Sequence, residues 1–85
     1  MEVQSLFREI AYKSCSITIK DELMSLTLEG INIDVINDEE LLLGGNNVLS
    51  LNWNEAKITK EEGTEGTIYH VDFPGKQVYI EVPKI

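Results

Sequence analysis

A stretch of alternating apolar and polar residues, from Leu23 to Ile36, constrains the fold of this chain more than any other feature. It reads LMSLTLEGINIDVI, and the side chains of a β-strand point alternately to the two faces of a sheet. A two-residue turn at Glu29-Gly30 would suit this pattern, because glycine readily adopts the positive φ of a tight hairpin turn. Six apolar side chains would then share one face: Met24, Leu26, Leu28, Ile31, Ile33 and Val35. We therefore predict a central hairpin whose Leu26 and Ile33 are both buried.

A second hairpin is predicted near the end of the chain. Pro74-Gly75 fits the central positions of a type II turn. That turn would place Val71 opposite Val78 and Tyr69 opposite Ile80, so that one face of the hairpin is again apolar.

The residues before the first strand predict a helix. Apolar residues recur at helical spacing over positions 2–13 and form one stripe: Val3, Leu6, Phe7, Ile10 and Ala11. A helix of about twelve residues is marginal in isolation, so this stripe must pack on another element. The apolar face of the sheet is the expected partner, and a groove on another protein is the alternative.

Shorter patterns supply the remaining strands. Apolar and polar residues alternate over 15–20 and over 48–53, which predicts a strand in each range. A turn after Trp53 would pair that residue with Ala56, at the start of a further strand over 56–60. Residues 38–43 fit either a single helical turn or an edge strand. Trp53 is in phase with Leu49 and Leu51, which favours a place in the core over a role as an exposed interface anchor.

These elements predict one α+β domain over residues 1–85. The N-terminal helix would pack on an antiparallel meander of six to seven short strands, and glycines such as Gly30 and Gly44 would let the sheet bend into a half-barrel. The expected core residues are Leu6, Phe7, Ile10, Ile17, Ile19, Leu26, Leu28, Ile31, Ile33, Leu51, Ile58, Val71 and Val78.

The environment expected for this domain is the cytoplasm. The single cysteine, Cys15, excludes an intrachain disulfide framework and suits a reducing compartment. The sequence has no apolar run of about 18 residues, as a membrane span would need, and no signal peptide pattern at its start.

The negative charge of the chain is concentrated in one segment. The formal net charge is −8, and residues 21–56 contain eight acidic residues but no lysine or arginine. Such a surface attracts basic partners and repels the phosphate backbone of nucleic acid, so direct nucleic-acid binding is not expected. The alternative is that the acidity serves only to keep a small protein soluble.

The titratable residues do not form a recognisable catalytic or metal-binding pattern. Cys15 and His70 could form a nucleophile and base only if the fold brought them together, and Cys15 is in phase with buried residues. The acidic residues near Asp34 do not follow the spacing of an EF-hand loop, and one histidine with one cysteine cannot hold a structural zinc ion. We expect no cofactor, no metal and no enzymatic activity, with His70 beside Tyr79 on a strand.

The expected function is a non-enzymatic protein-interaction module, an inhibitor or adaptor that binds a basic partner. That partner could be a nucleic-acid-binding protein, since an acidic domain can mimic the charge of nucleic acid. In size and charge the chain is of the same general type as proteins from mobile elements that block nucleic-acid enzymes. The expected partner-binding residues are Glu29, Asp34, Asp38, Glu39 and Glu40. The main alternative is a structural subunit that forms a homo-oligomer through the edges of its sheet. A small enzyme or ligand carrier with a pocket between helix and sheet ranks below both.

Overall fold

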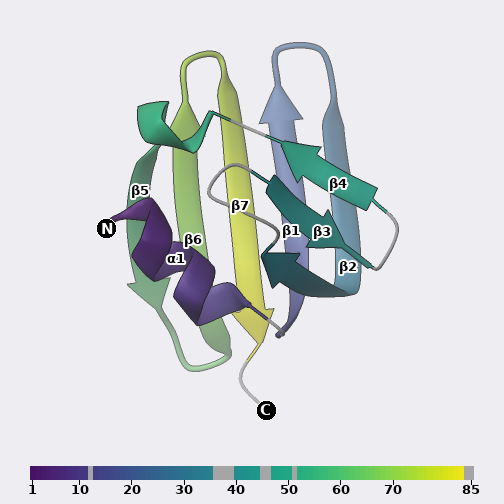
Figure 1. Cartoon of the computed structure of the whole chain (residues 1–85), viewed down its shortest axis with the longest axis vertical. Helices are drawn as coiled ribbons and strands as arrows, with labels where there is room; N and C mark the ends of the chain where they lie inside the picture. The colour runs from purple at the N-terminus through teal and green to yellow at the C-terminus, as the bar shows by residue number, and fades with distance from the viewer. Residues whose placement is uncertain (12, 36–39, 45–46, 51, 84–85) are drawn as a thin grey trace.

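The computed structural model describes residues 1–11, 13–35, 40–44, 47–50 and 52–83 of the chain. Within these residues, one short N-terminal helix precedes a seven-stranded antiparallel sheet, as Figure 1 shows. The elements are α1 (Val3–Ile10), β1 (Ser14–Asp21), β2 (Ser25–Val35), β3 (Glu40–Leu43), β4 (Asn47–Ser50), the 3₁₀ turn η1 (Trp53–Glu55), β5 (Lys57–Glu62), β6 (Gly66–Phe73) and β7 (Lys76–Pro83). This arrangement confirms the helix and the antiparallel sheet in outline.

The strand order departs from the single meander that we predicted. The order across the sheet is β4-β3-β2-β1-β7-β6-β5, so two meanders meet where β1 pairs with β7. In that pairing Ile17 lies opposite Ile80 and Ile19 opposite Val78. The connection through η1 therefore carries the chain from one edge of the sheet to the other.

The predicted central hairpin is wrong, because β2 runs without a turn through Glu29 and Gly30. Ile17 of β1 pairs with Leu28, and Cys15 pairs with Ile31, so the single residue between them on β1 lies opposite two residues of β2. This is a β-bulge, and the extra residue keeps Leu28 and Ile31 on the same face. Gly30 has φ of 62°, so the positive φ expected for a hairpin turn serves the bulge.

The apolar face of β2 is covered over only part of its length. Ile33 is fully buried, whereas Leu26 is 51% exposed, so only one of the two residues behaves as the hairpin predicted. Leu26 lies on the part of β2 that pairs with β1, near the turn at residues 22–24. Figure 1 shows this β1–β2 turn projecting beyond β3 and β4. The apolar side chains of Leu23, Met24 and Leu26 at this turn are exposed.

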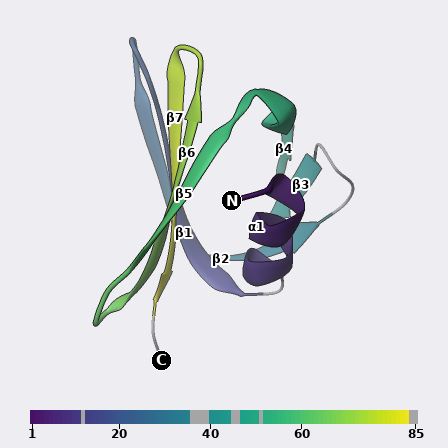
Figure 2. The same cartoon turned by 90° about the vertical axis from the view of Figure 1, so that its left-hand side faces the viewer.

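The sheet bends around the core but does not close. Figure 2 shows β1, β5, β6 and β7 in one layer, with α1 and β3 on the opposite side, and β2 passing from one layer to the other. Among the described residues, β4 and β5 form the two ends of the strand order and do not pair with each other.

The core lies between these two layers. The helix contributes Leu6, Phe7 and Ile10, all buried. Trp53 is also buried, and its ring makes edge-on contacts with Phe7 and Phe73, with centroid distances of 5.1 and 5.5 Å. The other buried apolar residues are Cys15, Ile17, Ile33, Leu41, Leu43, Ile58, Tyr69, Val71, Val78 and Ile80. Trp53 is thus a core residue.

Of the other local predictions, one hairpin is confirmed and one is wrong. The C-terminal hairpin is confirmed, with Val71 opposite Val78 and a turn at Pro74-Gly75. The predicted pairing of Trp53 with Ala56 is wrong, because η1 begins at Trp53 and β5 pairs with β6. Residues 40–43 form a strand that is paired on both sides, so β4 takes the edge position.

One further prediction gave the limits of the helix, and another concerned a residue that the structure does not describe. The helix is shorter than the predicted 2–13, because the backbone is already extended at Ala11. Leu51, a predicted core residue, lies outside the described part of the chain. No helix within the described residues is both long enough and apolar enough to cross a membrane.

Candidate protein-interaction surface

The outward face of the ladder formed by β2, β3 and β4 combines acidic and apolar side chains. Leu41 and Leu43 of β3 point into the core, so Leu42 and Glu40 point outward. Asp34 of β2 lies directly opposite Leu42, and Leu42 lies directly opposite Val48 of β4. We call this surface the β2–β3–β4 outward face, and its described residues are Asp34, Glu40, Leu42, Val48 and Ser50.

This face is accessible in the folded chain. Val48 is 54% exposed and Asp34 is exposed, while Leu42 and Glu40 are half-buried. In Figure 1, α1 lies beside β3 and β4 and does not cover them. Side chains opposite one another across a ladder lie about 5 Å apart, so the acidic group and the two apolar groups form one continuous surface.

The structure brings together only part of the predicted binding set. Asp34 and Glu40 share this face on neighbouring strands. Glu29 is exposed as well, but it lies in the β-bulge, opposite β1, and belongs to a different part of the sheet. Asp38 and Glu39 lie outside the described residues.

Leu42 and Val48 are members of this face that sequence reasoning did not identify. A signal for Leu42 was present in the run Leu41-Leu42-Leu43, because a strand with three successive apolar residues must point one of them away from the others. Val48 and Leu49 are two successive apolar residues, so the same reasoning applies to them, with one residue fewer. Both were missed because the pairing partners of this segment were not known.

A second exposed apolar group lies at the β1–β2 turn. Leu23 is 94% exposed, and Met24 and Leu26 are also largely exposed. The Asp21 carboxylate accepts hydrogen bonds from the backbone N–H groups of Leu23 and Met24, both at 2.8 Å, and these bonds lower the pKa of Asp21. The Asp21 side chain is therefore bonded to the backbone of the turn at two points.

The charges around this turn are mixed. A surface hollow of about 380 Å³ beside it is lined by both acidic and basic groups, among them Lys20, Asp21, Glu22 and Lys76. The turn has no excess of one charge sign, so it offers no electrostatic preference for a basic partner.

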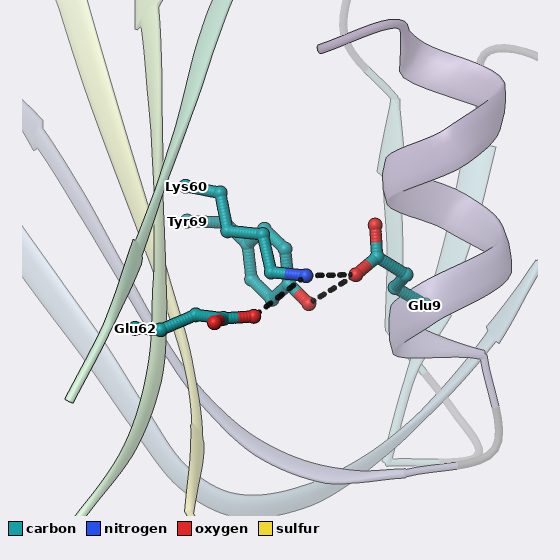
Figure 3. A network of polar contacts seen from close by, with 4 residues as sticks. All are labelled: Glu9, Lys60, Glu62 and Tyr69. Atoms are coloured by element: carbon teal, nitrogen blue, oxygen red, sulfur yellow. Dashed lines mark hydrogen bonds and ion pairs between the residues drawn. The ribbon is translucent and has the colours of Figure 1, made fainter. Parts of the chain in front are cut away.

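A network of polar contacts joins the helix to the sheet (Figure 3). The Lys60 ammonium group donates to the Glu9 carboxylate at 2.6 Å and lies 3.2 Å from Glu62. The Tyr69 hydroxyl donates to the same Glu9 oxygen at 3.2 Å. The hydrogen bond from Lys60 lowers the pKa of Glu9, whereas burial and the Glu9 charge raise the pKa of Tyr69. The network connects α1 with β5 and β6.

Cys15 and His70 do not form a catalytic pair, because they lie on opposite faces of the sheet. Cys15 is 1% exposed on the inner face, where burial raises the pKa of its thiol to about 11. His70 is on the outer face, with its ring edge-on to Tyr79 at a centroid distance of 5.3 Å and its Nε2 3.1 Å from Glu61. The predicted contact of His70 with Tyr79 is confirmed.

The acidic residues do not converge on a common point in the described structure. No group of three or more potential metal ligands occurs among residues 1–11, 13–35, 40–44, 47–50 and 52–83.

Comparison with protein-family models, with curated protein sequences and with solved structures found no match to this chain.

Proposed function

We propose that this chain is a non-enzymatic interaction module that binds a basic protein partner through its β2–β3–β4 outward face. The observation that carries this proposal is the cross-strand row in which Asp34, Leu42 and Val48 lie side by side. Interfaces combine an apolar centre with polar groups at its rim, and Leu42 with Val48 would supply that centre. Asp34 and Glu40 would then pair with lysine or arginine at the rim.

The distribution of charge distinguishes this face from the rest of the sheet. On the outer face of β5, β6 and β7, a comparable row contains Glu61, Ile68 and Glu81. The residues outside 21–56 carry seven acidic and seven basic residues in total, whereas residues 21–56 contain eight acidic residues and no lysine or arginine. A basic partner would therefore be drawn to the β2–β3–β4 outward face first.

A nucleic-acid-binding protein is the class of partner that fits this chemistry best. Its basic surface is built to neutralise phosphates with lysine and arginine side chains. A compact acidic domain on that surface would compete with nucleic acid for it, and the chain would then act as an inhibitor or adaptor.

The test is a comparison of two charge-matched variants in a pull-down from lysate of the source organism. The first variant combines Asp34→Lys and Glu40→Lys, and the control combines Glu61→Lys and Glu81→Lys, so that both change the net charge equally. We expect wild type and control to capture the same basic protein at low salt, and the first variant to lose it. The complex should also dissociate at about 0.5 M salt, because salt at that concentration screens the attraction between exposed charges.

Equal capture by both variants would overturn the proposal, because the binding face would then lie elsewhere. Equal loss by both would also overturn it, because net charge alone would explain the attraction.

A homo-oligomer formed through sheet edges is the second candidate, and β4 is the observation that favours it. This terminal strand of the sheet has the sequence NVLS and no charged residue. Charged side chains on edge strands normally prevent pairing between copies. Sedimentation across a range of concentrations distinguishes the two: a dimer that resists salt supports the homo-oligomer, and a monomer throughout excludes it.

A further inference from the structure

The two edges of the sheet differ in how well they are protected from a further strand. The β5 edge has the sequence KITKEE, with four charged residues in six, and its Ile58 carbonyl accepts a hydrogen bond from the Met1 nitrogen at 3.3 Å. The β4 edge has no charged residue. Charges on an edge strand oppose the addition of another strand. The β5 edge therefore disfavours pairing with a further strand, whereas the β4 edge does not.

The backbone of β4 is paired on one side only. Its four residues pair with β3, from Asn47 opposite Leu43 to Ser50 opposite Glu40. Within the described residues, Asn47–Ser50 form no backbone hydrogen bond outside that ladder. Within the part of the chain that the structure describes, no strand therefore lies along the other side of β4, where alternate N–H and C=O groups could pair with an incoming strand.

We propose that β4 accepts an extended segment of the partner as an eighth strand, and that this segment alternates basic and apolar residues. The inference rests on the proposed function and specifies how the partner docks. In an added strand, every second side chain would lie beside Val48 and Ser50 on the outward face. Neighbouring strands lie about 4.8 Å apart, so a lysine there would reach Glu40 on β3, whereas Asp34 on β2 lies two strands beyond β4 and would act only through its longer-range charge. The other side chains would lie beside Leu49, which is half-buried on the inner face. Basic residues suit the first set and apolar residues the second.

The charge of the chain argues against a second copy as the occupant. Two copies would each bring a net charge of −8, and the β4 strand itself supplies no base to offset Asp34 or Glu40. A basic segment would both pair with the backbone of β4 and neutralise the acidic face. A strand from a different protein is therefore favoured over a second copy of this chain.

The test uses synthetic peptides and the full chain. The first probe is a six-residue peptide of alternating lysine and valine with both ends blocked. The second has the same side chains but methyl groups on the backbone nitrogens of one edge, which removes hydrogen-bond donors and keeps the charge. The third replaces lysine with glutamate. Fluorescence anisotropy measures affinity at low salt, and amide hydrogen exchange shows which strand is protected.

We expect the first peptide to bind and to slow amide exchange in β4. The methylated peptide should bind about tenfold more weakly or worse, because each lost hydrogen bond costs about 1 kcal/mol. The glutamate peptide should not bind. Substitution of Asp34→Asn with Glu40→Gln should weaken the first peptide, whereas Glu61→Gln with Glu81→Gln should not.

Four results would overturn the strand addition, and they separate it from the function on which it rests. Equal binding of the first two peptides means that the acidic face binds charge without pairing a strand, so only the further inference fails. Protection of β5 instead of β4 has the same meaning. Binding of the glutamate peptide as tight as that of the lysine peptide contradicts the proposed function as well. No binding of any peptide rejects the strand addition, and the pull-down then decides the function alone.

Discussion

The buried thiol of Cys15 shows how a position in a strand determines the chemistry of a side chain. Its phase in the sequence, two residues before Ile17, predicted burial, and the structure places it on the inner face of β1. Loss of hydration disfavours the thiolate, which accounts for the raised pKa. The expected inertness of this cysteine is thus a consequence of strand alternation.

The raised pKa of Cys15 predicts a loss of stability in alkali. In the unfolded chain the thiol ionises near pH 9, whereas in the folded chain its pKa is about 11. The unfolded state therefore binds fewer protons between these values, and stability falls as pH rises, by at most about 1.4 kcal/mol per pH unit. Urea unfolding from pH 8 to 11 should show a steeper fall for wild type than for Cys15→Ala. Parallel curves would show that the thiol does not contribute.

Tyr69 provides a second prediction for a single side chain. Tyr69→Phe removes the hydrogen bond to Glu9 and keeps the buried ring, so the free energy of unfolding should fall by about 1 kcal/mol. Tyr79→Phe is the control, because its hydroxyl bonds to Gln77 at an exposed site and its loss should cost less than about 0.5 kcal/mol. Chemical denaturation measures both values, and equal effects would show that the helix-to-sheet network adds no stability.

Strand β2 shows why the type of an element can be predicted wrongly even when the residues on each of its faces are predicted correctly. A turn at Glu29-Gly30 and a bulge at the same residues both use the positive φ of Gly30, and both keep Leu28 and Ile31 on one face. The alternation of the sequence is therefore the same for the two structures. The pairing of β1 along β2 on both sides of Gly30, with Ile17 opposite Leu28 and Cys15 opposite Ile31, distinguishes them, and the alternation of β2 alone carries no information on that pairing.

A cross-linking experiment distinguishes the bulged strand from the predicted hairpin. In the structure, Thr18 lies opposite Thr27 with 3.2 Å between their hydroxyl oxygens. A hairpin with its turn at Glu29-Gly30 would instead place Thr27 opposite Asn32. In a Cys15→Ala background, Thr18→Cys with Thr27→Cys should form a disulfide readily. Thr27→Cys with Asn32→Cys should not, and mass spectrometry after oxidation reports both. A disulfide only in the second pair would restore the hairpin.

At the scale of the whole molecule, the bent sheet determines which acidic residues act together. The sequence predicted one acidic segment, but the fold separates Glu29 at the bulge from Asp34 and Glu40 on the β2–β3–β4 outward face. Local hairpins, such as that at Pro74-Gly75, were predictable from neighbouring residues. The crossover through η1 was not, because there Trp53 contacts rings from α1 and β6, which lie far from it in the sequence.

The central claim is that the β2–β3–β4 outward face binds a basic protein, and a footprint of the complex tests it most directly. The protein captured in the pull-down would be titrated into the chain with labelled methyl groups, observed by NMR at low salt. We predict that the methyl signals of Leu42 and Val48 shift on binding, while that of Ile68 on the opposite outer face does not. Shifts of Ile68 with unchanged signals from Leu42 and Val48 would contradict the account.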